Sequence, residues 1–230
     1  MRLNPRWLMG ATVAVVVIAF VLTIHDFLAI SRPVHGDILV VEGWIWRSSA
    51  MKEAAAEFHR GQYRWLVTVG ESVEDNGRGS AKRDVADLAA QRLREYGVDD
   101  GVIVVLPSPD VPWHRTYASA LTLKEWLARS KIETTGVNVF TLGAHARKSL
   151  VLFQRALGTG TRVGVIAGTD ESYQAHRWWL SPTGIYVIMR KTLGYLYAVW
   201  WPLPQNLVVS SESVRTPLSS ATDGQKGRSR

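Results

Sequence analysis

A histidine and two cations directly follow an apolar run in the second half of the chain. Residues 137–142 read Val-Asn-Val-Phe-Thr-Leu, and Gly143, His145, Arg147 and Lys148 come next, where a helical pattern begins. In a parallel α/β sheet this order predicts a strand, a tight turn and a helix N-terminus, where backbone N–H groups and the helix dipole favour an anion. His145 is therefore a candidate acid or base, and Arg147 and Lys148 are candidate anion ligands.

These side chains also have ordinary structural interpretations. His145 would cap the helix or lie on the surface, and a pair of charges in a first helical turn is commonly solvated. The position of His145 directly after an expected strand favours the functional interpretation.

Small and polar residues follow the other expected strands as well. Parallel strands bring their carboxyl ends to one edge of the sheet, where ligands of such folds bind. We therefore expect a pocket lined by Glu42 and Gly43, by Gly70, Glu71 and Ser72, by Ser108, by Gly143 and His145, and by Gly168, Thr169 and Asp170. Either Glu71 or Glu42 would be the carboxylate partner of His145.

Arg115 and Thr116 begin another expected helix, after a proline-rich loop at residues 107–112. Arg115 is a candidate ligand for a phosphate or a carboxylate. Thr116 would either cap its helix or bond a phosphate oxygen, and capping is the more common role. Ser80 precedes a further expected helix, where capping is again the ordinary interpretation.

Several sharper motifs are absent from the sequence. The chain has no cysteine, which excludes disulfides, thiolate nucleophiles and cysteine metal ligands. It has no G-x-S-x-G motif, and the glycine-rich residues 158–164 precede an apolar run instead of following one, as a nucleotide loop would. Six histidines lack metal-ligand spacing, so no metal site is predicted, and the sequence does not identify a cofactor.

The elements that must position these residues alternate regularly. Apolar runs predict five strands, at residues 37–43, 65–69, 102–106, 137–142 and 162–167. Amphipathic patterns predict the helices between them, at residues 51–58, 81–96, 115–130 and 145–157. This alternation predicts an α/β fold with a doubly wound, mostly parallel five-stranded sheet that helices cover on both faces.

An apolar segment precedes this domain. Residues 8–24 are uninterrupted by charge, and residues 27–30 extend the run to the roughly 20 residues that a membrane span needs. Arg2 and Arg6 precede it, which predicts a single-pass protein of the inner membrane with a cytoplasmic N-terminus and an extracytoplasmic domain. A cleaved signal peptide and a buried core helix are the alternatives. No small-x-small cleavage pattern follows the run, which favours an uncleaved anchor in contact with the bilayer at residues 8–30.

The C-terminal part is rich in tryptophan. Residues 174–180 predict a short helix that contains Trp178 and Trp179, and residues 183–201 predict a longer apolar and aromatic helix. Arg190 and Lys191 lie near the centre of the longer helix, and charge there is costly in lipid. That helix would pack on the domain or lie at the membrane surface, with spanning as a third alternative.

These features divide the chain into three parts. Residues 1–36 form the N-terminus, anchor and linker, residues 37–204 form the α/β domain, and the polar residues 205–230 are expected to be disordered. The formal net charge is +7, but the basic residues are dispersed, so nucleic acid is not an expected partner.

The chain resembles the ElyC/SanA/YdcF family of bacterial envelope-associated proteins over about residues 37–197. The resemblance rests on residues 38–43 (Ile-Leu-Val-Val-Glu-Gly), 69–71 (Val-Gly-Glu), 115–120 (Arg-Thr-Tyr-Ala-Ser-Ala) and 141–149 (Thr-Leu-Gly-Ala-His-Ala-Arg-Lys-Ser). Thr141 and His145 match a threonine that the family places four residues before a histidine, so Thr141 is a further candidate ligand residue. The family arginine is replaced by Lys148, with Arg147 beside it. Glu71 stands where the family commonly has a glycine.

The resemblance implies an anchored, extracytoplasmic Rossmann-like domain that acts in cell-envelope biogenesis. We expect it to bind or process an anionic, phosphorylated envelope precursor that Arg115, Arg147 and Lys148 hold while His145 donates a hydrogen bond or a proton. Whether the protein is an enzyme stays open.

Two alternative functions also remain open. A non-enzymatic assembly or scaffolding protein would use Trp178, Trp179, Trp200 and Trp201 as its contact surface. An enzyme that binds a nucleotide or S-adenosylmethionine would require the opposite membrane topology.

Overall fold

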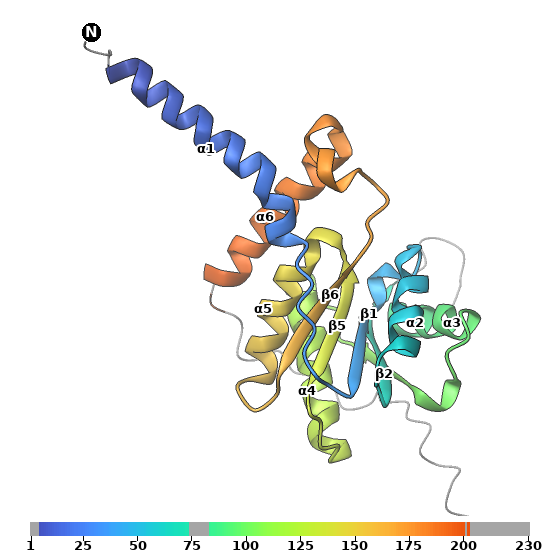
Figure 1. Cartoon of the computed structure of the whole chain (residues 1–230). Coiled ribbons are helices and arrows are strands. Elements are labelled where there is room, and N and C mark those ends of the chain that lie inside the picture. The colour runs from blue at the N-terminus through green and yellow to red at the C-terminus, as the bar shows by residue number, and fades with distance from the viewer. Residues whose placement is uncertain (1–4, 74–82, 201, 203–230) are drawn as a thin grey trace, which may run out of the picture.

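Five strands of the domain form one parallel sheet, which confirms the predicted doubly wound, Rossmann-like α/β fold (Figure 1). The computed structural model describes residues 5–73, 83–200 and 202. Its parallel strands are β1 (Ile38–Glu42), β2 (Trp65–Val73), β4 (Ile103–Ser108), β5 (Val137–Leu142) and β6 (Val163–Gly168). They are arranged in the order β4-β2-β1-β5-β6, so β1 and β5 are neighbours although they are far apart in the chain. The strand order reverses between β1 and β5, and ligands of such sheets bind at that point.

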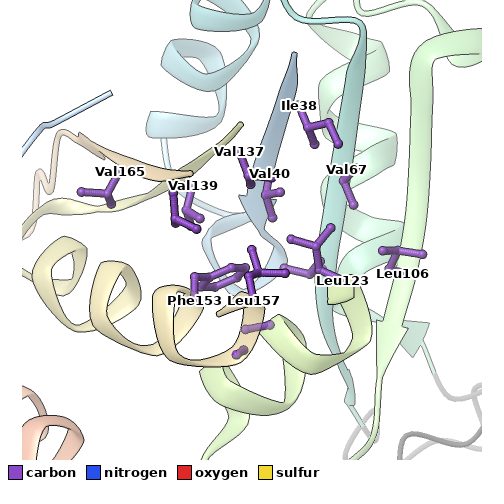
Figure 2. Packing of buried hydrophobic residues seen from close by; sticks show 14 of the residues in the cluster. Ile38, Val40, Val67, Leu106, Leu123, Val137, Val139, Phe153, Leu157 and Val165 are labelled. Atoms are coloured by element: carbon purple, nitrogen blue, oxygen red, sulfur yellow. The ribbon is translucent and has the colours of Figure 1, made fainter. Parts of the chain in front are cut away.

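Helices cover both faces of this sheet, as predicted. They are α2 (Ala50–Arg60), α3 (Val85–Glu95), α4 (Arg115–Ser130) and α5 (Ala146–Leu157). Side chains of β1 alternate between two separate cores, because successive residues of a strand point to opposite faces. Ile38 and Val40 pack with α4 and α5, and Leu39 and Val41 pack with α2 and α3. Figure 2 shows the first core, in which the Phe153 ring of α5 lies beneath the strand valines.

The structure differs from the sequence prediction at the second strand. β2 does not end at Val69 but continues to Val73, because Gly70 and Glu71 still pair with Pro107 and Ser108 of β4. The short strand β3 (Arg83–Asp84) then pairs antiparallel with the end of β2, so α3 begins at Val85 and not at residue 81. Ser80, the expected cap, lies outside the described residues.

A glycine permits the close approach of β2 to α3. A Cβ on Gly70 would lie 2.4 Å from the side chain of Val85, the first residue of α3. Pro107 is accommodated in β4 because β4 lies at the edge of the parallel sheet, where a strand can lack one N–H donor.

Two apolar helices complete the structure. α1 (Pro5–Leu28) projects away from the domain. α6 (Pro182–Trp200) crosses α1 near the C-terminal end of α1 (Figure 1). Between β6 and α6, the residues Ala175–Leu180 form a 3-10 helix, η4. Ile24 and Leu28 of α1 are buried with Ala144, Tyr173, Trp178 and Ile188 in a third apolar cluster. The end of α1 is therefore part of the folded domain.

The segment Met9–Leu28 of α1 is long and apolar enough to cross a membrane, with a mean hydropathy of 2.2. A helix of this kind near the N-terminus fits a membrane span and also a signal sequence. In residues 5–73, 83–200 and 202 it is the one helix that is long and apolar enough to cross a membrane, and α6 is not. One face of α6 packs on the domain, as predicted, with Gly184, Ile188 and Ala198 buried. The expected disordered tail, residues 205–230, lies outside the described part of the chain.

The first core allows a stability prediction. Phe153→Ala should lower the free energy of unfolding by about 3–5 kcal/mol, because the fully buried ring would leave a cavity between α5 and the sheet. Denaturant-induced unfolding of the detergent-solubilised chain measures this loss. The neighbouring exposed substitution Gln154→Ala is the control and should leave the stability within about 0.5 kcal/mol. Equal stability of the two variants would contradict the packing.

Candidate functional site

A cleft of about 450 Å³ opens at the carboxyl edge of the sheet, near the point where the strand order reverses. The ends of β1 and β2, the start of α4, the start of α5 and the middle of α6 all contribute side chains to it. The charged and histidine residues that line it are Glu42, Glu71, His114, Arg115, His145, Lys148, Arg190 and Lys191. The structure thus brings together, in one cleft, seven of the residues predicted from sequence: Glu42, Gly70, Glu71, Arg115, Thr116, His145 and Lys148.

His145 is buried in the wall of this cleft, between the 3-10 helix η3 (Gly143–His145) and α5. Burial, together with the charges of Lys191, Lys148 and Arg190, lowers the pKa of His145 well below its usual value, so the imidazole is neutral at pH 7. Its Nδ1 lies 3.1 Å from the Nζ of Lys191. A protonated lysine has only hydrogens to donate, so Nδ1 accepts and the imidazole proton is assigned to Nε2.

The protonated nitrogen of His145 points toward the other polar groups of the cleft. Nε2 is 3.4 Å from the Oγ1 of Thr116 and 3.9 Å from the Oε2 of Glu42. The second distance is longer than a hydrogen bond, so Glu42 is not a hydrogen-bonded carboxylate partner of His145. His145 therefore offers an N–H donor to a ligand in the cleft.

Glu42 is a buried carboxylate at the end of β1. It accepts hydrogen bonds from the hydroxyl of Thr141, at the end of β5, and from the hydroxyl of Ser149 in α5, at 2.9 Å. Thr141 is fully buried and acts on the cleft through Glu42. Ser149 belongs to the 141–149 stretch of the resemblance, but it was not identified from the sequence as a candidate site residue.

Lys148 and Lys191 lie close to Glu42 and are largely enclosed. Burial lowers the pKa of Lys148, and the charge of Arg190 adds to this while Glu42 opposes it. Burial and Arg190 together lower the pKa of Lys191 to about 8, again against the attraction of Glu42. Both ammonium groups are poorly solvated, and an anionic ligand would supply the stabilising partner that water supplies at the surface.

Arg115 and Glu71 also line the cleft and form an ion pair, with 2.9 Å between guanidinium nitrogen and carboxylate oxygen. Burial raises the pKa of Glu71, while the charge of Arg115 lowers it and Asp110 and Glu42 raise it. The cleft as a whole is lined by four cationic side chains and two carboxylates, so it carries a positive excess.

Several residues of the cleft, among them Lys191, Arg190 and Trp44, were missed as functional candidates. Lys191 appeared in the sequence only as a charge that disfavours a membrane span, and Trp44 was not considered. The Nζ of Lys191 lies 4.7 Å from the centre of the Trp44 ring, which is also packed edge-on against His145. The signals were present: Trp44 follows Glu42 and Gly43 at a strand end, and a charge inside an apolar helix marks a functional position.

Other predicted residues lie outside this cleft. Arg147 is one residue from Lys148 and therefore on another face of α5, where its Nε donates to the carbonyl of Phe27 and its guanidinium lies 3.8 Å above the Phe27 ring. Gly43 packs against the backbone of Val85. The side chain of Ser72 is outside the described part of the structure, and Ser108 instead donates to the hydroxyl of Ser119 within the protein, at 3.0 Å.

The residues after β5 and β6 line a second, smaller cavity of about 320 Å³. It contains Gly143, Gly168, Thr169 and Asp170, so the predicted single pocket is divided into two. Gly143 has a φ of +45°, and a Cβ there would lie 3.0 Å from that of Asp170.

Thr116 is not the cap of α4. That position is held by His114, which has a φ of +62°.

Comparison of the chain with protein-family models, with curated proteins and with solved structures finds no match. The resemblance to the envelope-associated family therefore stays a prediction. In the described residues, no group of three or more His, Asp or Glu side chains is placed to hold a metal ion. What the cleft offers is a set of cations and one neutral N–H donor, an arrangement suited to a phosphate or another oxyanion.

The contact between Lys191 and His145 leads to a titration prediction. Lys191→Met should raise the pKa of His145, because it removes a nearby positive charge, but the pKa should stay below 6.5 because the ring remains buried. Histidine proton resonances followed against pH by NMR measure this. Lys124→Met removes an exposed lysine of α4 outside the cleft and should leave the pKa of His145 unchanged. An unchanged His145 pKa in Lys191→Met would contradict the contact.

Proposed function

We propose that this protein is a membrane-anchored, extracytoplasmic α/β domain that binds a phosphorylated cell-envelope precursor. The observation that carries the proposal is the group of four cations and a neutral histidine around the cleft at the sheet switch point. Only two carboxylates line the same cleft, and both have protein partners. A phosphorylated ligand would neutralise the excess positive charge.

The size and composition of the cleft support a ligand larger than a single phosphate. Its volume of about 450 Å³ is within the range of sites for small organic molecules, which is about 300–1,000 Å³. Trp44 and Trp113 line it beside the cations, and Trp113 is 77% exposed. Aromatic faces next to a phosphate site suit the uncharged part of a precursor, such as a sugar ring or the first units of a lipid chain.

The contacts of α1 support an anchor that stays attached to the domain. Ile24 and Leu28 are buried against it, and the indole N–H of Trp178 donates to the carbonyl of Val21 at 3.2 Å. Cleavage after the apolar run would remove these partners and expose Trp178 and Tyr173 to water. The arginines before the run support a cytoplasmic N-terminus, since positive residues favour that side.

Within this proposal each group has a distinct role. Lys148, Arg190 and Lys191 hold the phosphate oxygens as charge-assisted donors. The Nε2–H of His145 donates to a phosphate oxygen, and in a reaction the same proton would be available to a leaving oxygen. Trp44 and the Nδ1 acceptor of His145 hold the Lys191 ammonium in place.

The scaffolding alternative loses part of its surface. Trp178 is 4% exposed and Trp179 is half-buried, so these side chains pack between α1 and η4 and are not free to form a contact surface. Trp200 is 81% exposed, and Trp201 lies outside the described residues.

A topology reporter fused after residue 202 tests the nucleotide or S-adenosylmethionine alternative, which requires a cytoplasmic domain.

Charge removal in the cleft should weaken binding. Lys148→Gln and Arg190→Gln should each weaken the binding of a polyisoprenyl diphosphate in detergent micelles by about tenfold or more, since a charge-assisted hydrogen bond contributes about 1.5–3 kcal/mol. Isothermal titration calorimetry of the full chain measures this. Lys124→Gln makes the same change of charge outside the cleft and should bind normally. Normal binding by both cleft variants would contradict the assignment of the cleft as the binding site.

Binding should also depend on pH. The Lys191 ammonium is protonated below a pKa of about 8 and neutral above it, so affinity for the same diphosphate should fall as the pH rises through about 8. Lys191→Met has no such proton to lose, so its affinity should be lower and nearly independent of pH over this interval. A native affinity that stays constant from about pH 7 to about pH 9 would exclude Lys191 as a ligand.

A further inference from the structure

The face of α6 that points away from the domain is apolar. Its large side chains are exposed by 44% to 81%, and they recur every three or four residues, as one face of a helix requires: Ile185, Tyr186, Met189, Leu193, Leu196 and Trp200, here called the α6 outer face. A surface helix ordinarily presents polar residues to water. α6 contains only two charged residues, of which Arg190 is exposed and Lys191 is partly buried. An apolar exposed area of this extent marks a contact with lipid or protein.

The length of α1 indicates which of these covers it. The domain packs on α1 from Val21 onward, where the carbonyl of Val21 accepts from Trp178. The part of α1 that lies beyond the domain, from Pro5 to Phe20, is 16 residues or about 24 Å long. A hydrocarbon core is about 30 Å thick, and a match to it requires the full Met9–Leu28 segment of 20 residues. A bilayer that α1 crosses therefore extends to the depth at which η4 and α6 pack on α1.

The surfaces of the two helices are also continuous. The Phe27 ring of α1 is 41% exposed and packs edge-on against Tyr195 of α6, with 5.3 Å between ring centres. α6 crosses α1 near the domain instead of running beside it (Figure 1). A helix that crosses a membrane-spanning helix in this way lies along the plane of the bilayer.

The composition of α6 fits the bilayer interface better than its interior. Tyr186 and Trp200 have amphipathic rings, which are favoured at the level of the lipid head groups. The guanidinium of Arg190 lies 5.8 Å from the centre of the Tyr186 ring and also lines the cleft. It thus extends from the apolar face toward the polar cleft, as an interfacial arginine does.

We propose that the α6 outer face lies in the interfacial layer of the bilayer that α1 crosses. The domain is then held against the membrane by two elements, and the cationic cleft opens at the level of the lipid head groups. This placement rests on the membrane anchor of the proposed function but not on its ligand.

The test uses the absence of cysteine, which allows a single spin label to be attached at any chosen position of the full chain. Leu193→Cys and Leu196→Cys report on the α6 outer face. Val16→Cys reports on the exposed part of α1, and Lys124→Cys reports on the exposed face of α4. In the chain reconstituted in lipid nanodiscs, electron paramagnetic resonance compares label collisions with oxygen, which concentrates in lipid, and with a water-soluble nickel chelate.

Labels at positions 193 and 196 should collide preferentially with oxygen, as the label at position 16 does, while the label at position 124 should collide preferentially with nickel. Nickel preference at 193 and 196, with oxygen preference at 16, would overturn the α6 placement and leave the anchor intact. Nickel preference at all four positions would overturn the anchor as well. Protection from both reagents with magnetic coupling between labels would show that a second copy covers the face, and this too would overturn the proposal.

Discussion

A buried carboxylate joins the parts of the protein between which the cleft opens. Glu42 belongs to β1, and it accepts from Thr141 of β5 and Ser149 of α5, so one side chain ties the two central strands to the helix that follows them. A charge at this depth requires such partners, because an unpaired buried carboxylate is costly. Its negative charge in turn helps to keep Lys148 and Lys191 protonated beside it. The positive cleft thus depends on a negative group in its floor.

The electrostatics of the site follow from this arrangement. Burial, together with two enclosed lysines and Arg190, lowers the pKa of His145 and keeps the ring neutral. Lys191 occupies its Nδ1, so the remaining ring proton is directed into the cleft. No element holds this site alone, since the strand ends position Glu42 and Glu71 while α6, far along the chain, supplies Arg190 and Lys191. The last helix is therefore as much a part of the site as the sheet is.

Much of the fold followed from local patterns, because alternating apolar runs and amphipathic helices leave few topologies for a parallel sheet. The bounds of α4 and β5 were predicted correctly for this reason. The extension of β2 was not, since it depends on pairing with β4. His145 and Lys148 were identified by their place after a strand. Lys191 and Trp44 were missed because their proximity arises from the packing of α6, and no local spacing encodes that contact.

The contact between Arg147 and Phe27 has a consequence for the orientation of the domain relative to α1. The guanidinium of Arg147, in α5, binds both the carbonyl and the ring of Phe27 in the last turns of α1. Ile24 and Leu28 are buried in the adjacent apolar cluster. A domain joined to such a helix by a flexible linker would take many orientations relative to it. Here the end of α1 and the domain form one packed unit, so the direction of this helix fixes the orientation of the whole domain.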